Sequence, residues 1–158
     1  QIAFEALTRL LDPSAVRQDH LYMSRVTNAD GEVEGVSVAG SKLGGDIAGA
    51  IVLFPDTMGA TGGSMAEAAT IYKSLEGGRP AKLIAVNLIV TPEYLRTLRD
   101  RHPDMIIYAL RLDRGLSDPK IMKTPLGSHW DEEHGLNERQ YIVPGAGGLG
   151  EILNNSYV

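Results

Sequence analysis

The chain has 158 residues, of which 43% are hydrophobic and 22% are charged, a composition typical of a globular protein and not of a disordered or collagen-like chain. Fifteen Lys and Arg against 20 Asp and Glu give a net charge of −5, which disfavours nucleic acid as a partner. The sequence contains no cysteine, which excludes disulfides and cysteine zinc sites, and no apolar run of about 20 residues, so we expect one soluble cytoplasmic domain over residues 1–158 with no membrane contact.

The amino-terminal part of the chain predicts a helix followed by a β-hairpin. Apolar residues recur at helical spacing from Ile2 to Leu11, and Asp12-Pro13 ends the pattern because the residue before a proline is disfavoured in a helix. Two strands are expected on either side of Asp30-Gly31, a dipeptide that favours a tight turn, at residues 20–27 and 34–39.

From residue 50 onward, apolar strands alternate with helices. Three short apolar runs are typical of strands that are covered on both faces, namely residues 50–55, 82–90 and 105–110. Helical patterns separate them at residues 65–75 and 92–101. This alternation predicts an α/β fold in which a parallel sheet is flanked by helices and carries the β-hairpin as an arm. Ligands of such sheets bind beyond the carboxyl ends of the strands.

The segment from Asp113 to Gln140 is polar and rich in turn residues, which predicts a long loop or an extended hairpin. It contains the run His129-Trp130-Asp131-Glu132-Glu133-His134, whose side chains could bind a metal, but the spacing matches no metal motif. A solvated loop is the favoured interpretation, and no metal ligand is assigned. The preceding helix carries basic residues that we expect to give solubility, Arg96, Arg99 and Arg101, and His102 is expected at the surface or as a cap.

The clearest chemical signal is the junction between strand and helix at residues 56–64. Asp56 follows the apolar strand, and Thr61-Gly62-Gly63-Ser64 opens the helix. The first amides of a helix lack intrahelical partners and lie at the positive end of its dipole, so an anion fits there, and glycines let a phosphate approach. Asp56 is placed to accept hydrogen bonds from sugar hydroxyls, so the junction predicts a cradle for a phosphorylated ribose. The motifs of P-loops and dinucleotide-binding turns are absent from this segment.

Two separated motifs resemble the uracil phosphoribosyltransferase family and follow the family's order. The junction Asp56-Thr57-Met58-Gly59-Ala60-Thr61-Gly62-Gly63-Ser64 resembles its loop for phosphoribosyl diphosphate (PRPP), and Tyr141-Ile142-Val143-Pro144-Gly145 resembles its uracil-binding segment. His102-Pro103-Asp104 and Asp113-Arg114-Gly115-Leu116 fall between them. The resemblance implies a phosphoribosyltransferase-type fold that usually assembles as a homodimer or a higher homo-oligomer.

The resemblance also implies roles for individual residues. Asp56 would bind the ribose hydroxyls, and the residues after it would wrap the 5′-phosphate: Thr57, Met58, Gly59, Ala60, Thr61, Gly62, Gly63 and Ser64. Arg25 would meet the diphosphate, which carries Mg²⁺, so Arg25 and Asp56 are the expected catalytic residues. Uracil would be recognised by its segment and the glycine-rich turn that follows: Tyr141, Ile142, Gly147, Gly148 and Leu149.

The chain departs from the family's pattern in several places. Gly148 stands where the family has an acid, and Leu149 where it has an alanine. Thr57 and Gly59 replace a proline and a leucine, which is expected to loosen the loop. The family's amino-terminal portion is absent, which predicts an amino-terminally truncated chain. Residues 117–134 are an insertion, expected to be a loop, a lid or a subunit arm.

Three functions stay open from the sequence. The first is an enzyme of pyrimidine salvage that transfers 5-phosphoribosyl from PRPP to uracil, giving UMP and diphosphate. The second is a homologue with little or no turnover that binds UMP or PRPP as a regulator, which the missing acid at Gly148 favours. The third is a partner subunit that completes the site of another chain.

Overall fold

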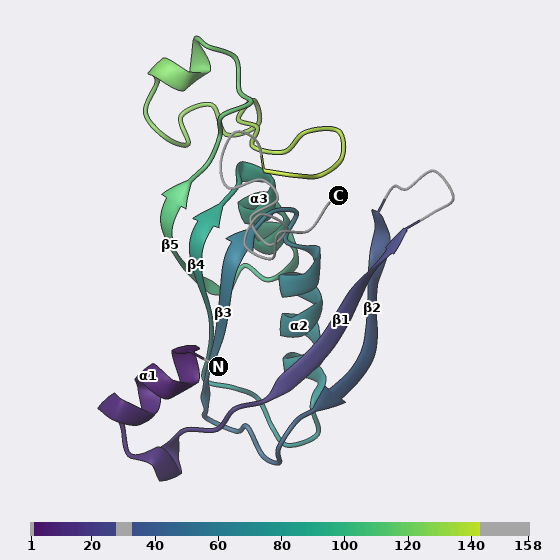
Figure 1. Cartoon of the computed structure of the whole chain (residues 1–158), viewed down its shortest axis with the longest axis vertical. Coiled ribbons are helices and arrows are strands. Elements are labelled where there is room, and N and C mark those ends of the chain that lie inside the picture. The colour runs from purple at the N-terminus through teal and green to yellow at the C-terminus, as the bar shows by residue number, and fades with distance from the viewer. Residues whose placement is uncertain (1, 28–32, 143–158) are drawn as a thin grey trace.

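The amino-terminal helix forms where the sequence predicts it. The structure is a computed structural model that describes residues 2–27 and 33–142, and it begins with α1 (Ile2–Leu10) (Figure 1). A short 3₁₀ turn, η1 (Pro13–Ala15), follows, and Asp12 caps it by accepting a hydrogen bond from the N–H of Ser14 at 2.9 Å. Asp12-Pro13 therefore ends the helix as expected, although the 3₁₀ turn itself was not predicted.

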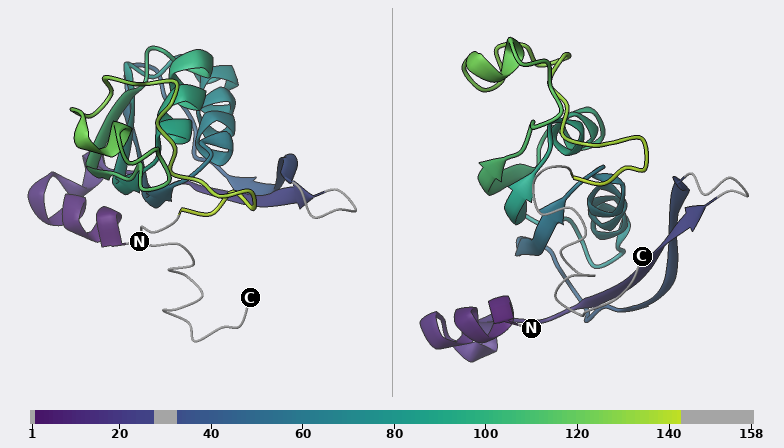
Figure 2. Two further views of the ribbon diagram at one scale, coloured as in Figure 1. Left: turned by 90° about the horizontal axis from the view of Figure 1, so that it is seen from above. Right: turned by 45° about the horizontal axis from the view of Figure 1, so that its top comes forward.

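The next two strands form the expected hairpin. β1 (His20–Thr27) pairs antiparallel with β2 (Val33–Lys42) in a two-stranded sheet. The turn predicted at Asp30-Gly31 lies outside the described residues. Both Figures 1 and 2 show the hairpin reaching away from the rest of the fold as an arm, with β2 in contact with α2 (Gly63–Ser74).

The remaining strands confirm the α/β fold with a parallel sheet. β3 (Ile51–Gly59), β4 (Lys82–Val90) and β5 (Ile106–Leu112) pair in the order β3-β4-β5, and all pairs are parallel. α2 connects β3 to β4, and α3 (Pro92–Arg101) connects β4 to β5. The sheet is therefore built from two successive strand–helix–strand units, as the alternation in the sequence predicts.

The hydrophobic core lies between the sheet and the two helices. Figure 2 shows α2 and α3 on the same side of the three strands. Side chains from this side of the sheet and from both helices are buried together, among them Leu83, Ala85, Ala66, Ala69, Tyr72 and Leu98. The strands alternate inward and outward side chains, so every second residue points away from this core.

The opposite face of the sheet is apolar but exposed in the described part of the chain. The register aligns Leu53, Ile84 and Ile106 in one row across the strands and brings Val86 beside Tyr108 in the next. Leu110, in β5, is 83% exposed. The prediction that all three strands are covered on both faces is therefore not met by the described residues, because both helices lie on one side.

Residues 113–140 are irregular, as predicted. Up to residue 142, where the description ends, this part contains the short 3₁₀ turn η2 (Ile121–Lys123) and the isolated bridges of Gly115 with His134 and of Leu136 with Ile142. In Figure 1 this segment lies at the upper end of the sheet, where the strands end.

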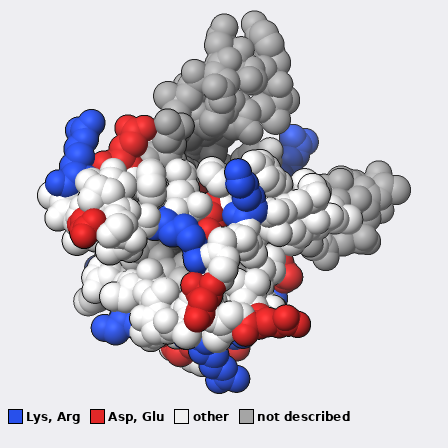
Figure 3. Space-filling view, turned by 90° about the horizontal axis from the view of Figure 1, so that it is seen from below, with Lys and Arg blue, Asp and Glu red and all other residues white. Residues whose placement is uncertain are grey.

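Charged residues of both signs are mixed on the surface. Figure 3 shows Lys, Arg, Asp and Glu dispersed over the lower face of the molecule, without a patch of one sign. Within residues 2–27 and 33–142, none of the helices is both long and apolar enough to cross a lipid bilayer.

Candidate functional site

The three parallel strands end together at one edge of the sheet. In the register of the sheet, Gly59 at the end of β3 lies beside Val90, and Val90 lies beside Leu112 at the end of β5. The segments that follow the strands therefore start at this edge. Parallel α/β sheets bind their ligands here, so the chemistry of the site depends on what these segments offer.

The turn between β3 and α2 requires a glycine at position 62. Gly62 has a φ of +82°, in the left-handed region that other residues rarely adopt. A Cβ atom on Gly62 would lie 2.9 Å from Cβ of Thr97 and 3.1 Å from the carbonyl oxygen of Tyr94. Thr97 also donates a hydrogen bond from Oγ1 to the carbonyl oxygen of Thr61 at 2.7 Å. The turn is therefore held directly against α3.

The first turn of α2 offers backbone N–H groups to an anion. Gly62 is the N-cap and supplies no side-chain hydrogen bond, and the first turn carries no acidic residue. Oγ1 of Thr61 accepts a hydrogen bond from the N–H of Gly63 at 3.4 Å, and the neighbouring Ser64 is exposed. The amides without intrahelical partners and the positive end of the helix dipole together fit a phosphate group.

Asp56 lies inside β3 and not after it. The strand continues past its predicted end at residue 55 to Gly59, and Asp56 pairs with Asn87 of β4. Oδ1 of Asp56 accepts a hydrogen bond from the N–H of Met58 at 3.2 Å. Although the residue as a whole is exposed, desolvation by the surrounding protein raises the pKa of its carboxyl above the ordinary 3.8 and outweighs the lowering effect of the Met58 hydrogen bond.

Gly59 makes room for an aromatic ring. A Cβ atom on Gly59 would lie 2.7 Å from Cδ2 and 2.8 Å from Cε2 of Tyr94, which is closer than real contacts allow. Gly59 is buried and paired in the regular ladder with Val90. The expectation that Gly59 loosens the loop is therefore wrong, because the missing side chain lets α3 pack tightly against the strand.

Two buried polar residues beside Asp56 were missed by the sequence reasoning. Nδ2 of Asn87 donates a hydrogen bond to the carbonyl oxygen of Asp56 at 3.0 Å. The hydroxyl of Tyr94 donates to Oδ1 of Asn87 at 3.1 Å. One signal could have identified Asn87, which is the single polar residue between Leu83 and Val90 of β4.

The structure describes the other predicted site residues only in part. Arg25 lies in β1 opposite Val36, and its side chain lies outside the description, so its role stays a prediction. Ile142 is buried, and Tyr141 exchanges two hydrogen bonds of 3.0 Å with Asn137, from its N–H to Oδ1 and from the Asn137 N–H to its carbonyl oxygen. Gly147, Gly148 and Leu149, predicted to bind uracil, lie outside the described residues.

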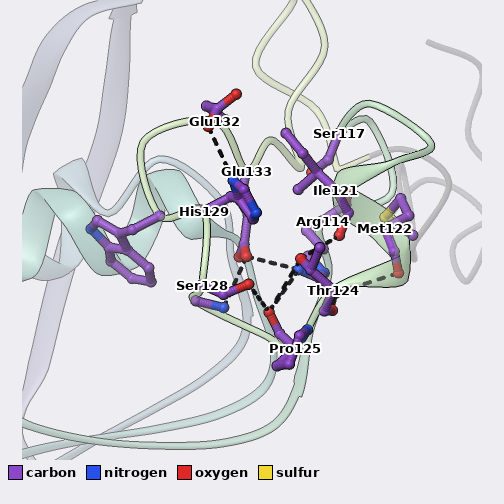
Figure 4. Close-up of polar contacts among 12 residues, drawn as sticks. Arg114, Ser117, Ile121, Met122, Thr124, Pro125, Ser128, His129, Glu132 and Glu133 are labelled. Atoms are coloured by element: carbon purple, nitrogen blue, oxygen red, sulfur yellow. Dashed lines mark hydrogen bonds and ion pairs between the residues drawn. The ribbon is translucent and has the colours of Figure 1, made fainter.

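Residues 117–134, which the family's pattern predicts to be an insertion and which are called the insertion below, are anchored by a buried ion pair near their base. Nη1 of Arg114 lies 2.7 Å from Oε1 of Glu133, and both side chains are buried (Figure 4). Nη2 of Arg114 also donates to the carbonyl oxygen of Thr124 at 2.6 Å, and the N–H of Gly127 donates to the Glu133 carboxylate at 2.8 Å. The interpretation of this segment as a solvated loop is therefore wrong for Glu133, whose carboxylate organises the fold of the insertion.

Two of the residues expected to lie at the surface belong to the packing of α3. Arg96 donates from Nη1 to the carbonyl oxygens of Trp130, at 2.7 Å, and Glu133, at 3.1 Å, so it holds the insertion and does not only give solubility. His102 follows α3 as its C-cap, as one expectation had it, but it is buried, with Nε2 placed 2.8 Å from the carbonyl oxygen of Ala66. Both corrections come from contacts with distant parts of the chain.

A cavity elsewhere in the protein does not coincide with this edge. It has a volume of about 290 Å³ and lies at the opposite, amino end of β4, lined among others by Lys73, Arg79, Lys82 and Asp104. The candidate site is instead an open cradle on the surface, made of Asp56 and the turn into α2. A phosphate at a helix N-terminus needs amides and not an enclosed cavity, so the backbone geometry of the cradle can serve as the site.

Comparison with known proteins identifies one family. The family model for uracil phosphoribosyltransferase matches residues 20–132. A uracil phosphoribosyltransferase of Clostridium botulinum (strain Eklund 17B / Type B) is 36% identical over 112 residues, which cover 71% of this chain and 43% of that protein. The enzyme of that name from Caldanaerobacter subterraneus is 38% identical over 112 residues, covering 71% and 42%. The chain thus spans less than half the length of these relatives.

A solved structure shares the fold. The AQ2163 protein from Aquifex aeolicus superimposes with a TM-score of 0.62 at 24% sequence identity, covering 85% of this chain and 51% of that chain. At this identity the likeness supports the α/β architecture and carries no argument about the ligand.

Proposed function

The chain belongs to the uracil phosphoribosyltransferase family, and from that premise we propose that it acts in pyrimidine salvage as a phosphoribosyltransferase. In the proposed reaction the bond between C1′ of the ribose and the diphosphate oxygen breaks. A bond forms between C1′ and N1 of uracil, and N1 loses its proton. The products are UMP and diphosphate.

The junction of β3 and α2 is the observation that carries this proposal. The 5′-phosphate of PRPP would accept hydrogen bonds from the amides that open α2, reached through the left-handed turn at Gly62. The Asp56 carboxylate would accept hydrogen bonds from the ribose hydroxyls. Holding the ribose at both ends fixes C1′ relative to the incoming base, and such positioning is a large part of catalysis when the protein forms no covalent bond to the substrate.

The remaining parts of the proposed site rest on the family. Arg25 would meet the diphosphate, whose negative charge grows as the C1′–O bond breaks. Ile142 and residues 147–149 would read uracil through backbone groups, and Tyr141, whose own backbone groups bind Asn137, would lie beside them. The homo-oligomeric assembly that the family usually shows stays a prediction, which light scattering of the purified protein can test.

The magnesium ion of the proposed reaction would arrive with the substrate. The described residues hold no group of three or more His, Asp or Glu side chains that could cage a metal. Mg²⁺ is often bound through substrate phosphates, which PRPP would supply, so no protein ligand is assigned and Asp56 keeps its proposed role at the ribose hydroxyls. When bound, the ion neutralises charge on the diphosphate leaving group.

Formation of UMP from uracil, PRPP and Mg²⁺ tests the proposal. We expect turnover in the wild type, a loss of about tenfold or more in kcat/KM for Asp56→Asn, and no change for Asp100→Asn, a matched substitution of an exposed aspartate on α3. Equal loss in both variants would contradict the assigned role of Asp56.

Ligand-induced stabilisation separates the enzyme from a binding protein. If the chain is an enzyme, PRPP with Mg²⁺ should raise the melting temperature more than UMP at equal concentration, because the stabilisation by a bound ligand increases with the logarithm of its affinity. UMP binding without turnover would favour the regulator. Absence of binding by either ligand would overturn the site altogether.

A further inference from the structure

Two buried polar side chains, those of Asn87 and Tyr94, lie beside the candidate cradle. Asn87 is 3% exposed and Tyr94 is 1% exposed, and both carry polar groups into the space between the sheet and α3. A buried amide or hydroxyl is costly unless it is hydrogen-bonded. Here both are satisfied, and the hydrogen bonds run in one direction toward the site.

The chain of hydrogen bonds connects α3 to Asp56 through β4. The Tyr94 hydroxyl donates to Oδ1 of Asn87, which leaves Nδ2 of Asn87 pointing at β3. That nitrogen donates to the carbonyl oxygen of Asp56. Because the Asn87 side chain is held at both ends, it fixes the backbone from which the Asp56 carboxylate projects.

The same face of α3 also holds the turn that follows. Tyr94 and Thr97 of α3 and its N-cap Thr91 are spaced three residues apart, so they lie on one side of the helix. The hydroxyl of Thr91 donates to the carbonyl oxygen of Ala60, and that of Thr97 donates to the carbonyl oxygen of Thr61. One rigid helix therefore sets Asp56 and the phosphate-binding turn relative to each other.

We propose that Tyr94 and Asn87 are positioning residues that set Asp56 for the ribose of PRPP. They do not contact the substrate; they act through the backbone of Asp56. The inference rests on the proposed function, because it assigns the role of Asp56 that the function requires.

The Tyr94 hydroxyl stays protonated and can donate in the hydrogen-bond relay that runs from Tyr94 through Asn87 to the carbonyl oxygen of Asp56. Burial raises the pKa of the Tyr94 hydroxyl well above 10, the hydrogen bond with Asn87 acts in the opposite direction, and the Asp56 charge adds to the rise. The tyrosine therefore keeps its proton throughout the neutral range and continues to donate to Asn87. The direction of both hydrogen bonds is then fixed over the pH range in which the enzyme would work.

The first test removes only the hydroxyl. Tyr94→Phe keeps the ring that packs on Gly59 but breaks the hydrogen bond to Asn87. Tyr72→Phe is the matched control, because Tyr72 is also buried and donates its hydroxyl to Asp19 at 2.8 Å, away from the cradle. We expect KM for PRPP to rise about three- to tenfold in Tyr94→Phe and to stay constant in Tyr72→Phe, with KM for uracil unchanged in both.

A second readout needs no substrate. Hydrogen exchange of the backbone amides of residues 58–64 should be faster in Tyr94→Phe than in wild type, and unaltered in Tyr72→Phe. Asn87→Ala should have the same effect as Tyr94→Phe, and the double variant should be no worse than the stronger single one, because both break one relay.

The outcomes separate the inference from the function. If wild type binds PRPP but Tyr94→Phe shows unchanged KM and unchanged exchange, the positioning role is overturned and the function stands. If wild type does not bind PRPP, the proposed function is overturned, and the positioning role for PRPP falls with it. In that case, faster exchange at residues 58–64 shows only that the hydrogen bonds of Tyr94 and Asn87 stabilise this segment.

Discussion

Arg114 and Glu133 form an ion pair of 2.7 Å between Nη1 and Oε1, with side chains that are 7% and 0% exposed, across 19 residues of sequence. The pair closes the insertion into a compact unit, because each partner also binds backbone groups inside it. The insertion is therefore held in a defined shape beside α3 and is not an unstructured connection.

Removal of Glu133 should unfold the insertion locally. Glu133→Ala leaves the Arg114 guanidinium buried without its counter-ion, and breaking a buried pair in this way costs about 3–5 kcal/mol. Hydrogen exchange over residues 114–133 should become much faster. Glu132→Ala is the control, because its side chain is 67% exposed and its ion pair is with the exposed His129, so it should cost less than about 1 kcal/mol. Similar exchange in the two variants would contradict the anchoring role.

The sequence predicts the regular elements well where local signals act. The bounds of β4 and α3 match the prediction at residues 82–90 and 92–101. The reason is local chemistry: Thr91 accepts a hydrogen bond from the N–H of Tyr94 at 3.0 Å, and Pro92 occupies the first helical position. The phosphate cradle stays a prediction that rests on the same kind of local signal, since glycines and a preceding acid mark it in a single short segment.

The supporting contacts could not be predicted because they join distant residues. Arg114 and Glu133 look like surface charges in the sequence, and only the path of the insertion brings them together. The role of Gly59 depends on the ring of Tyr94, which reaches it from another element. Neither relationship leaves a periodic pattern, so sequence reasoning assigned looseness or solvation where the fold has tight packing.

A substitution at Gly62 should destabilise the protein more than one at a comparable glycine. Gly45 also has a positive φ, of +60°, but a Cβ there would meet nothing within 4 Å. Gly45→Ala should therefore cost only the strain of the left-handed backbone, about 1–2 kcal/mol. Gly62→Ala should add about 1–3 kcal/mol because its Cβ would collide with Thr97. Urea unfolding of both variants measures the difference, and equal losses would show that the turn tolerates a side chain.

Side-chain truncation should lower the free energy of unfolding in the core between the helices and the sheet, but not on the exposed face of the sheet. Leu98 of α3 is 0% exposed, so Leu98→Ala should lower the free energy of unfolding by about 2–5 kcal/mol. Leu110 of β5 is 83% exposed, and Leu110→Ala should change it by less than about 0.5 kcal/mol. Urea unfolding at neutral pH checks both values. A large loss in Leu110→Ala would mean that a part of the protein outside the described residues, or another molecule, covers this face.

The ionised carboxylate of Asp56 should lower the stability of the folded protein at neutral pH, although it is proposed to bind PRPP. Its pKa in the folded protein is raised above 3.8, chiefly by desolvation, so the folded state binds the proton more readily than the unfolded state. The ionised carboxylate therefore opposes folding above the folded-state pKa, and this cost disappears as the pH falls through that pKa. Asp56→Asn removes the charge and should leave the melting temperature at pH 7 equal to or above that of wild type, although it weakens PRPP binding.

Asp104 provides the matched control with the opposite sign. The hydrogen bond from Lys73 is the main reason that its pKa is lowered from 3.8, so its ionised form supports folding above that value and the support is lost as the pH falls. Asp104→Asn should therefore lower the melting temperature slightly at pH 7, because the pair is largely exposed, and leave PRPP affinity unchanged. Melting curves from pH 7 to pH 3 should show each variant approaching wild type from opposite sides. If Asp56→Asn is instead the less stable protein at pH 7, the carboxylate of Asp56 has a structural role, and its assignment to ribose binding is contradicted.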